Sequence, residues 1–343
     1  MLVFFKQIMI FSDQRNNIIK QLKTIEAKSS FDENLAMQLF YYQFHNNKLY
    51  QEFCNHLHRN PSTVQTINEI PFLPISFFKT HKIITGNPSI SQTFLSSATT
   101  GMERSKHFLS DEELYKLNAV KAFERFYGSL ADYVIIALLP SYLEQGNSSL
   151  IFMVDEFIRL TNNSLSGFYL EDFGLISKNI QLALLKNKKI ILWGVSYALL
   201  DYAQVFDLKN VENLIVMETG GMKGRRREML KEELHLILTQ AFGVKTIHSE
   251  YGMTELLSQA YSDGLGLFKP AATMKILIRD INDPLSMEPI GKTGGLNVID
   301  LANIDSCAFI ATQDLGKLHQ NGTFEVLGRF DNSDVRGCNL MVG

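Results

Sequence analysis

Four short segments contain the side chains best suited to chemistry, and their types suggest a nucleotide site. In chain order they are Ser96-Ser97-Ala98-Thr99-Thr100-Gly101, Tyr251-Gly252-Met253-Thr254-Glu255, Thr312-Gln313-Asp314 and Gly328-Arg329-Phe330-Asp331. Hydroxyls and glycine can surround phosphates, a carboxylate can hold Mg²⁺ or ribose, and a guanidinium can balance phosphate charge. Together the segments predict an ATP site that activates a carboxylate by acyl adenylation.

The first segment predicts a phosphate-binding loop. Ser97, Thr99, Thr100 and Gly101 supply hydroxyls and accessible backbone N–H groups for a polyphosphate. The Walker pattern, GxxxxGK followed by Ser or Thr, is absent, so this would be a different kind of loop. An ordinary polar turn is the alternative interpretation when the segment is considered alone.

A glycine pair follows a predicted strand over 213–217 and precedes a predicted helix over 225–241. It therefore falls at the carboxyl edge of the predicted sheet, where open α/β folds bind ligands. Gly220 and Gly221 would let a flat adenine approach the backbone, and Met222 belongs to the same cofactor-binding segment. A simple tight turn is the alternative.

The segment 251–255 combines an aromatic ring, a hydroxyl and a carboxylate. Tyr251 is expected to stack on adenine and Thr254 to bond a phosphate oxygen. Glu255 is expected to ligate Mg²⁺ beside the phosphates. Gly252 is included in the same cofactor-binding segment.

Asp314 and Arg329 complete the predicted site. Asp314 is expected in a loop after a strand over 307–310, where its carboxylate can accept both ribose hydroxyls. Arg329 is expected at a strand end, where it can share the negative charge at the ribose or the α-phosphate. An exposed turn aspartate and a surface arginine are the alternatives.

Composition restricts the class of partner. The 343-residue chain has 33 basic and 36 acidic side chains and a net charge of −3, which is too balanced for a nucleic-acid surface. The three cysteines, Cys54, Cys307 and Cys338, lack zinc-ligand spacing. No apolar run is long enough to span a bilayer. We therefore expect a soluble, cytoplasmic protein that binds a small anion or another protein.

Hydrophobic periodicity predicts an α/β fold in three parts. Residues 1–90 have the apolar spacing of a helical N-terminal segment. Residues 91–266 alternate helical stretches, one of them over 111–127 with Ser110 as its N-cap, with buried strands over 133–139, 189–193 and 213–217. This alternation predicts a mostly parallel α/β core with the phosphate loop and adenine site. Residues 267–343 have the short strands and Gly/Pro turns of a small β-rich subdomain.

In this order the four segments resemble those of the adenylate-forming superfamily of acyl-CoA synthetases, adenylation domains and luciferases. Longer strings are similar to the acyl-protein synthetases of the bacterial luminescence fatty-acid reductase, the ligases of its luciferin component. These strings are Ile70-Pro71-Phe72-Leu73-Pro74-Ile75 with Phe78-Lys79, Leu139-Pro140-Ser141-Tyr142-Leu143-Glu144 with Ser148-Ser149-Leu150, Thr219-Gly220-Gly221-Met222-Lys223-Gly224, and Ser333-Asp334-Val335-Arg336-Gly337-Cys338.

The resemblance implies a large adenylating domain that uses ATP and Mg²⁺ to activate a fatty acid and then acylates a thiol. In the relatives, the loop matching 97–101 binds pyrophosphate, Glu255 meets Mg²⁺, Asp314 holds the ribose and Arg329 contacts the nucleotide. The luminescence branch carries its acyl group on a cysteine near the C-terminus, which Cys338 matches; a buried structural cysteine is the alternative. A carrier protein, an acyltransferase or a reductase is the implied partner.

Three departures from the superfamily affect these expectations. Ala98 stands where most relatives have glycine, and Gln313 replaces the glycine of the TGD segment. About a dozen residues follow Asp331, so the mobile C-terminal domain of acyl-CoA synthetases, with its adenylation lysine, is expected to be largely absent. Lys106 or Arg104 would then supply the positive charge at the α-phosphate.

Two other functions fit the same residues. In the first, the acyl group passes to coenzyme A or to the phosphopantetheine thiol of a carrier protein instead of a cysteine. In the second, the chain is a non-catalytic subunit of the adenylate fold that binds an acyl chain or a partner enzyme. The thioester formed with each acceptor, and pyrophosphate release, distinguish these possibilities.

Overall fold

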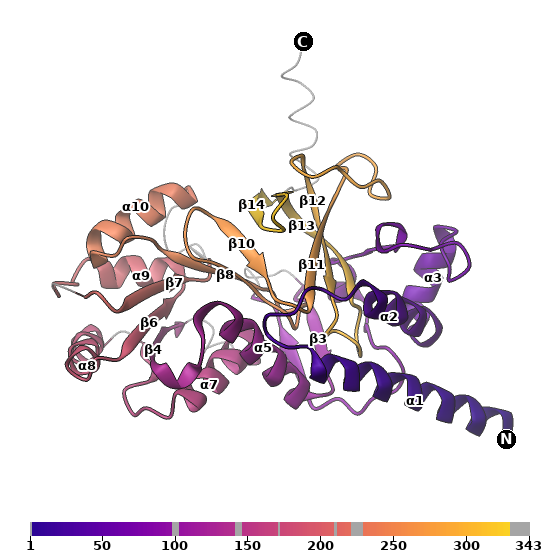
Figure 1. Ribbon diagram of the computed structural model, residues 1–343, viewed down its shortest axis with the longest axis horizontal. Coiled ribbons are helices and arrows are strands. Elements are labelled where there is room, and N and C mark those ends of the chain that lie inside the picture. Colours follow the sequence, from indigo (N-terminus) through magenta and orange to yellow (C-terminus); the bar gives the residue numbers. More distant parts are fainter. Residues whose placement is uncertain are drawn as a thin grey trace, which may run out of the picture.

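The computed structural model describes residues 2–97, 103–140, 146–170, 172–208, 211–220 and 229–329, with side chains from residue 13 onward. Helices surround a large twisted sheet (Figure 1). The longer helices are α1 (Leu2–Thr24), α2 (Glu33–Asn46), α3 (Lys48–His56), α5 (Glu112–Tyr127), α7 (Ser149–Thr161), α8 (Phe173–Leu185), α9 (Ser196–Ala203) and α10 (Lys231–Phe242), and α4 (Phe77–Thr80) is one turn long. None of the described helices is long and apolar enough to cross a membrane.

The described strands form one large sheet and one hairpin. The strands are β1 (Leu73–Pro74), β2 (Gln92–Leu95), β3 (Lys106–Leu109), β4 (Tyr133–Leu138), β5 (Gly167–Phe168), β6 (Lys189–Gly194), β7 (Leu214–Glu218), β8 (His248–Tyr251), β9 (Ala260–Ser262), β10 (Leu267–Pro270), β11 (Met274–Arg279), β12 (Thr293–Asp300), β13 (Phe309–Leu318) and β14 (Phe324–Arg329). The sheet order is β11-β12-β13-β14-β10-β9-β8-β7-β6-β4-β5, with β1 beside β13, while β2 and β3 form the hairpin.

The half of the sheet formed by β4 to β8 is parallel. Helices α5 and α7 lie on one side of these strands and α9 and α10 on the other (Figure 1). Every residue of β4 is buried, as expected of a strand covered on both faces. The α/β fold predicted from the alternation of apolar runs and helical stretches is confirmed.

The other half of the sheet is antiparallel, and β10 joins the two halves. Leu267 and Phe268 of β10 pair with β14, whereas Lys269 and Pro270 pair with β9. The strands before and after residue 266 therefore belong to one hydrogen-bonded sheet. The division of the chain at residues 90 and 266 stays a prediction.

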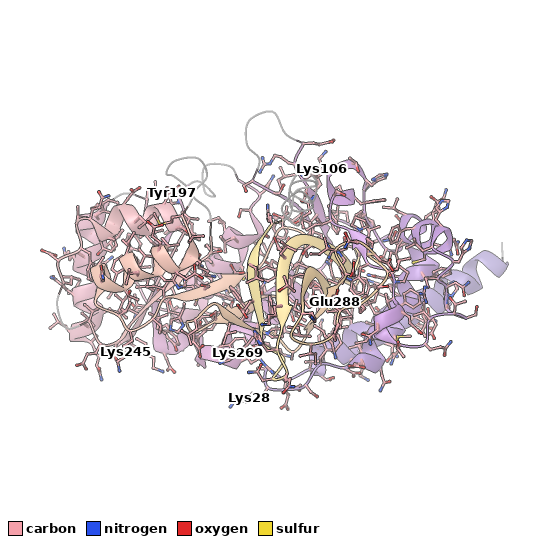
Figure 2. All side chains as sticks on the ribbon, turned by 90° about the horizontal axis from the view of Figure 1, so that it is seen from above. Lys28, Lys106, Tyr197, Lys245, Lys269 and Glu288 are labelled. Carbon is pink, nitrogen blue, oxygen red and sulfur yellow. The ribbon has the colours of Figure 1, made fainter. Side chains whose placement is uncertain are left out.

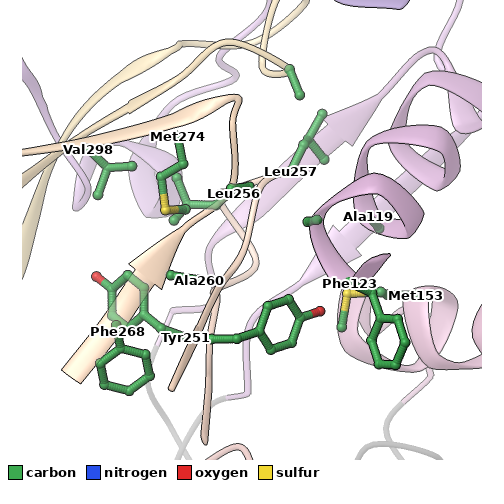
Figure 3. Packing of buried hydrophobic residues seen from close by; sticks show 14 of the residues in the cluster. Ala119, Phe123, Met153, Tyr251, Leu256, Leu257, Ala260, Phe268, Met274 and Val298 are labelled. Atoms are coloured by element: carbon green, nitrogen blue, oxygen red, sulfur yellow. The ribbon is translucent and has the colours of Figure 1, made fainter. Parts of the chain in front are cut away.

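A continuous hydrophobic core connects the helices with both halves of the sheet. Figure 3 shows part of it, with Phe123 and Met153 from α5 and α7, and Tyr251, Phe268 and Met274 from strands. The Phe123 side chain is fully buried, and burying a side chain of this size contributes about 1.5–3 kcal/mol. This core keeps the strand ends, and the polar residues on them, in fixed relative positions.

The N-terminal helices are attached to the turn between β12 and β13. The Gln43 Nε2 atom of α2 donates to the carbonyl oxygens of Asn303 and Ile304, and its Oε1 atom accepts from Ala308 N. Arg15 of α1 makes two hydrogen bonds to the Asp305 carboxylate, at 2.7 and 2.6 Å. These contacts fix the turn that carries Asn303.

The N-cap predicted for the helix over 111–127 is displaced by one residue. Asp111 is the N-cap of α5 and accepts from Leu114 N at 2.9 Å. The Ser110 hydroxyl instead donates to Asp305. A hydroxyl close to a buried carboxylate gains a stronger, charge-assisted hydrogen bond there than at a helix end.

Candidate active site

Three residues far apart in sequence meet at the candidate site. The Tyr251 hydroxyl of β8 donates to Asp314 Oδ2 at 2.9 Å, and Arg329 Nε of β14 donates to Asp314 Oδ1 at 3.2 Å. Asp314 and Arg329 are register partners in the β13–β14 ladder. The structure therefore brings together three of the residues that the sequence assigns to ATP.

Asp314 lies within β13, and the prediction that it belongs to a loop is wrong. The strand continues to Leu318 because it pairs with β12 on one side and β14 on the other. Thr312 and Asp314 are buried, while Gln313 between them is exposed. This part of the strand was not recognised from the sequence, because its buried positions hold a hydroxyl and a carboxylate instead of alternating apolar side chains.

The Asp314 carboxylate retains acceptor capacity for a ligand. Among the described residues, each of its oxygens accepts one hydrogen bond, from Tyr251 or Arg329, and each carboxylate oxygen has two acceptor positions. The Arg329 side chain is 75% exposed, whereas that of Asp314 is 8% exposed. A ligand can therefore reach the guanidinium from solvent while the carboxylate stays fixed.

The Tyr251 ring is held by aromatic neighbours. It makes edge contacts with Phe268 and Phe324, with ring centroids 5.9 and 5.5 Å apart. Burial, together with the Asp314 carboxylate, raises the pKa of Tyr251. The hydroxyl therefore stays protonated and donates to Asp314; the predicted stacking on adenine stays a prediction.

Glu255 is buried beside the base of the β2–β3 hairpin. Glu255 is 6% exposed. Burial raises the pKa of its carboxyl group, although Ser105 donates a hydrogen bond to that group. Asn303 Nδ2 donates to the Glu255 backbone oxygen at 2.8 Å, and His107 Nδ1 donates to the oxygen of Thr254 at 2.7 Å. Burial lowers the pKa of His107 to about 4, so its ring is neutral.

The described residues that flank the predicted phosphate loop are joined at the hairpin base. Ser96 N donates to Ser105 O at 3.1 Å, and the Ser96 hydroxyl accepts from Ser105 N at 2.9 Å. Ser105 also contacts the Glu255 carboxylate. Ser97 is exposed. Thr99, Thr100 and Gly101 lie outside the described residues.

Lys106 and Arg104 sit at the same hairpin base. Lys106 begins β3 and is exposed, and within the described part of the chain no hydrogen bond or ion pair joins it to Asp314 or Glu255. The Arg104 Nε atom donates to Ser96 O at 2.6 Å. Supply of positive charge by Lys106 stays a prediction.

The predicted adenine segment is described up to Gly220. Gly220 has φ +72°, a conformation that favours glycine, and its N–H donates to Glu218 at 2.6 Å. Gly221 and Met222 lie outside the described residues. At Gly252, a Cβ atom would collide with the Glu250 carboxylate, so any other residue there would require that carboxylate to move.

Two buried glutamates, which the sequence analysis did not assign, lie at the carboxyl ends of β7 and β8. Glu250 accepts from the Thr219 hydroxyl at 2.7 Å, and Glu218 accepts from Ser249 at 2.6 Å and lies 3.1 Å from Lys231. Burial raises the pKa of Glu250 to about 7. Burial opposes ionisation of Glu218 too, but hydrogen bonds and Lys231 lower its pKa to about 2. The sequence signal for Glu218 was its position at the end of the apolar strand β7.

The described cysteines are unsuited to acyl transfer. Cys54 and Cys307 are fully buried, and burial raises both thiol pKa values, that of Cys54 to about 12. The thiolate is the nucleophilic form. Cys338 lies outside the described residues.

Comparison with known proteins identifies a family model and relatives with similar sequences. The sequence model of the family "Acyl-protein synthetase, LuxE" matches residues 17–125. The long-chain-fatty-acid–luciferin-component ligase of Vibrio harveyi is 22% identical over 92% of this chain and 88% of its own. The resemblance expected from the sequence is therefore confirmed.

Solved structures show the same fold. An open 2-hydroxyisobutyryl-CoA ligase, in complex with 2-HIB-AMP and CoA, has a TM-score of 0.62 at 12% identity, covering 88% of this chain and 70% of that one. ATP-bound MatB from Rhodopseudomonas palustris has a TM-score of 0.53 at 20% identity and covers 71% of this chain. This chain spans about half of MatB, 49% of its length. This chain therefore shares the fold of these two solved structures.

Proposed function

We propose that this protein is an ATP-dependent ligase that converts a fatty acid into an acyl-adenylate and then transfers the acyl group to a protein thiol. The observation that carries the proposal is the cluster of Tyr251, Asp314 and Arg329 close to a buried Glu255, within the adenylate-forming fold. The name of the Vibrio harveyi relative supports a long-chain fatty acid as the substrate.

The cluster would bind the nucleoside part of ATP. The free acceptor positions on Asp314 suit the two ribose hydroxyls, and the bonds from Tyr251 and Arg329 keep the carboxylate in one orientation. The exposed Arg329 guanidinium would lie beside the α-phosphate and offset its charge. Binding at this site is therefore positional and electrostatic.

Glu255 would hold Mg²⁺ together with the phosphates. Its carboxylate is buried, and burial raises its pKa, so the charged form gains from a nearby cation. Mg²⁺ is commonly bound by one or two carboxylates plus substrate phosphates, which fits a single glutamate beside Ser105 at the hairpin base. When bound, the ion would neutralise charge on the phosphates.

The reaction would proceed in two substitutions. A carboxylate oxygen of the fatty acid attacks the α-phosphorus, the bond from that phosphorus to the bridging oxygen breaks, and pyrophosphate leaves. A thiolate then attacks the acyl carbon, and AMP leaves as the thioester forms. The hairpin base and β13–β14 would hold the reacting groups in line, which is the principal contribution of proteins to phosphoryl and nucleotidyl transfer.

Cys338 is the proposed acyl acceptor within the chain. Cys54 and Cys307 are buried and have raised pKa values, so neither supplies a reactive thiolate. The alternative acceptors of the acyl group are coenzyme A and a carrier protein. An acyltransferase or a reductase is a further possible partner. The cytoplasmic location stays a prediction.

Exchange of labelled pyrophosphate into ATP tests the first step. We expect exchange that depends on a fatty acid, measured from acetate to palmitate, and a loss of at least about 100-fold in Glu255→Gln. Glu232→Gln, an exposed glutamate of α10, is the matched control and should exchange normally. ATP binding without exchange for any acid would instead support the non-catalytic subunit.

A further inference from the structure

A cavity of about 710 Å³ lies at the amino-terminal ends of the parallel strands. Tyr133, Lys189 and His248 line it, and they are the first residues of β4, β6 and β8. Tyr251 of the candidate active site is at the opposite, carboxyl end of β8. Figure 2 shows Lys28 and Lys269 of the cavity on the side of the molecule away from Lys106.

The lining of the cavity is strongly cationic. It includes Lys28, Arg125, Lys189 and Lys269 but only one acid, Asp263. Burial lowers the pKa of His248, which also lines the cavity, so the imidazole adds little positive charge. The local charge of +3 contrasts with the net charge of −3 for the whole chain. Cationic clefts of this kind concentrate anions.

Two of these cations have no hydrogen bond or ion pair from their side chains within the described parts of the chain. Lys28 and Lys189 are exposed, and neither forms an ion pair in the described parts of the chain. The Lys189 Nζ atom lies 5.3 Å from the centre of the Tyr133 ring. Lys269 lies 3.2 Å from Asp263, and the Arg125 guanidinium donates to backbone oxygens of the α1–α2 connection. Lys28 and Lys189 are therefore the cations available to a ligand.

The apolar part of the lining is mainly aromatic. Phe126, Tyr127 and Tyr261 line the cavity, and the Tyr261 ring lies 5.5 Å from each of the other two. Ile215 adds an aliphatic side chain. These side chains offer an apolar surface to the body of a ligand.

We propose that this cavity binds a small organic anion with an aromatic or apolar body and a phosphate or carboxylate head. The cations would bind the head and the aromatic side chains the body. The volume falls within the range of about 300–1,000 Å³ that is typical of small-molecule sites. The site is separate from the proposed ATP site, and its occupancy does not depend on the proposed reaction.

Calorimetric titration with 1-naphthyl phosphate tests the proposal, and neutral 1-naphthol is the matched control ligand. We expect one molecule of the phosphate to bind per chain, with affinity falling at least about tenfold when 0.5 M NaCl screens the cations. No binding of the phosphate would overturn the proposal. Equal binding of 1-naphthol would also overturn it, because the cavity would then select the ring alone.

Variants locate the bound probe. The double variant Lys28→Gln/Lys189→Gln should bind at least about tenfold more weakly, because charge-assisted contacts to phosphate are lost. Lys245→Gln, an exposed lysine outside the lining, and Lys106→Gln, at the candidate active site, should bind normally. Weaker binding in Lys106→Gln alone would place the probe at the nucleotide site and overturn the proposal.

Discussion

Asp314 lies directly across the β13–β14 ladder from Arg329, and their Oδ1 and Nε atoms are 3.2 Å apart. Tyr251, the third member of this cluster, ends β8 in the same sheet. Backbone pairing therefore sets the distances between these side chains, without reliance on loops. A site built on strands is arranged before its ligand arrives, which reduces the entropic cost of binding.

Replacing Asp314 should weaken ATP binding specifically. The Asn amide in Asp314→Asn is neutral and has one acceptor oxygen instead of two. It therefore cannot replace all the hydrogen bonds that the carboxylate accepts from Tyr251, Arg329 and the ribose hydroxyls, and we expect the KM for ATP to rise at least about tenfold. The ATP dependence of pyrophosphate exchange measures this. Tyr251→Phe removes only one orienting bond and should have a smaller effect. An unchanged KM in Asp314→Asn would contradict the ribose assignment.

Asp300 should be essential for the segment that follows Glu255. Its buried carboxylate accepts from Leu257 N at 2.6 Å, from Ser258 N and Oγ at 3.1 and 2.6 Å, and from Ala302 N at 3.1 Å. Asp300→Ala leaves these buried donors unpaired, which should lower the free energy of unfolding by about 3 kcal/mol or more.

Urea unfolding measures the effect of Asp300→Ala. Asp283→Ala is the control, because Asp283 also caps backbone and hydroxyl donors but is exposed; its loss should cost less than about 1 kcal/mol. Equal losses in the two variants would show that the Asp300 network contributes no more than a surface turn.

Local sequence patterns were sufficient for much of the parallel sheet. The strands β4, β6 and β7 are continuous apolar runs because both of their faces are covered. Polar strands were not recognised, and β8 (His248–Tyr251) is the clearest example. Its Ser249 and Glu250 are buried by partners on other elements, which no short window of sequence records.

The same limit applies to the candidate site. Tyr251, Asp314, Arg329 and Glu255 were selected from short segments, whose order carried the signal. His107 had no comparable signal, because its contact with Thr254 joins residues 147 positions apart. Its role in holding the segment of Glu255 depends on the tertiary fold alone.

Cys338 should be separable from adenylation. In Cys338→Ser we expect pyrophosphate exchange to continue while incorporation of labelled fatty acid into the chain is lost, because only the second substitution needs the thiol. Cys54→Ser is the control for labelling, since Cys54 is buried with a pKa raised to about 12. Persistent labelling of Cys338→Ser would place the acyl group on another residue.

The buried glutamates should give stability two separate pH windows. Burial raises the pKa of Glu250 to about 7 from 4.5, so the folded chain retains a proton that the unfolded chain releases. Stability from this group is therefore lost as pH rises from about 4.5 to about 7. Hydrogen bonds and Lys231 lower the pKa of Glu218 to about 2 despite burial, so its contribution is present above about 4.5 and lost as pH falls toward 2.

Glu250→Gln isolates the upper window. Glutamine is always neutral and can still accept from the Thr219 hydroxyl, so the variant should gain stability relative to the parent as pH rises from 5 to 8. The gain is about 2.5 kcal/mol, because one pKa unit corresponds to about 1.4 kcal/mol and part of the effect is already present at pH 5. Urea unfolding at pH 5 and pH 8 measures it, with the exposed Glu232→Gln as control. A difference between variant and parent that is the same at both pH values would mean that Glu250 is already ionised in the folded protein at pH 5.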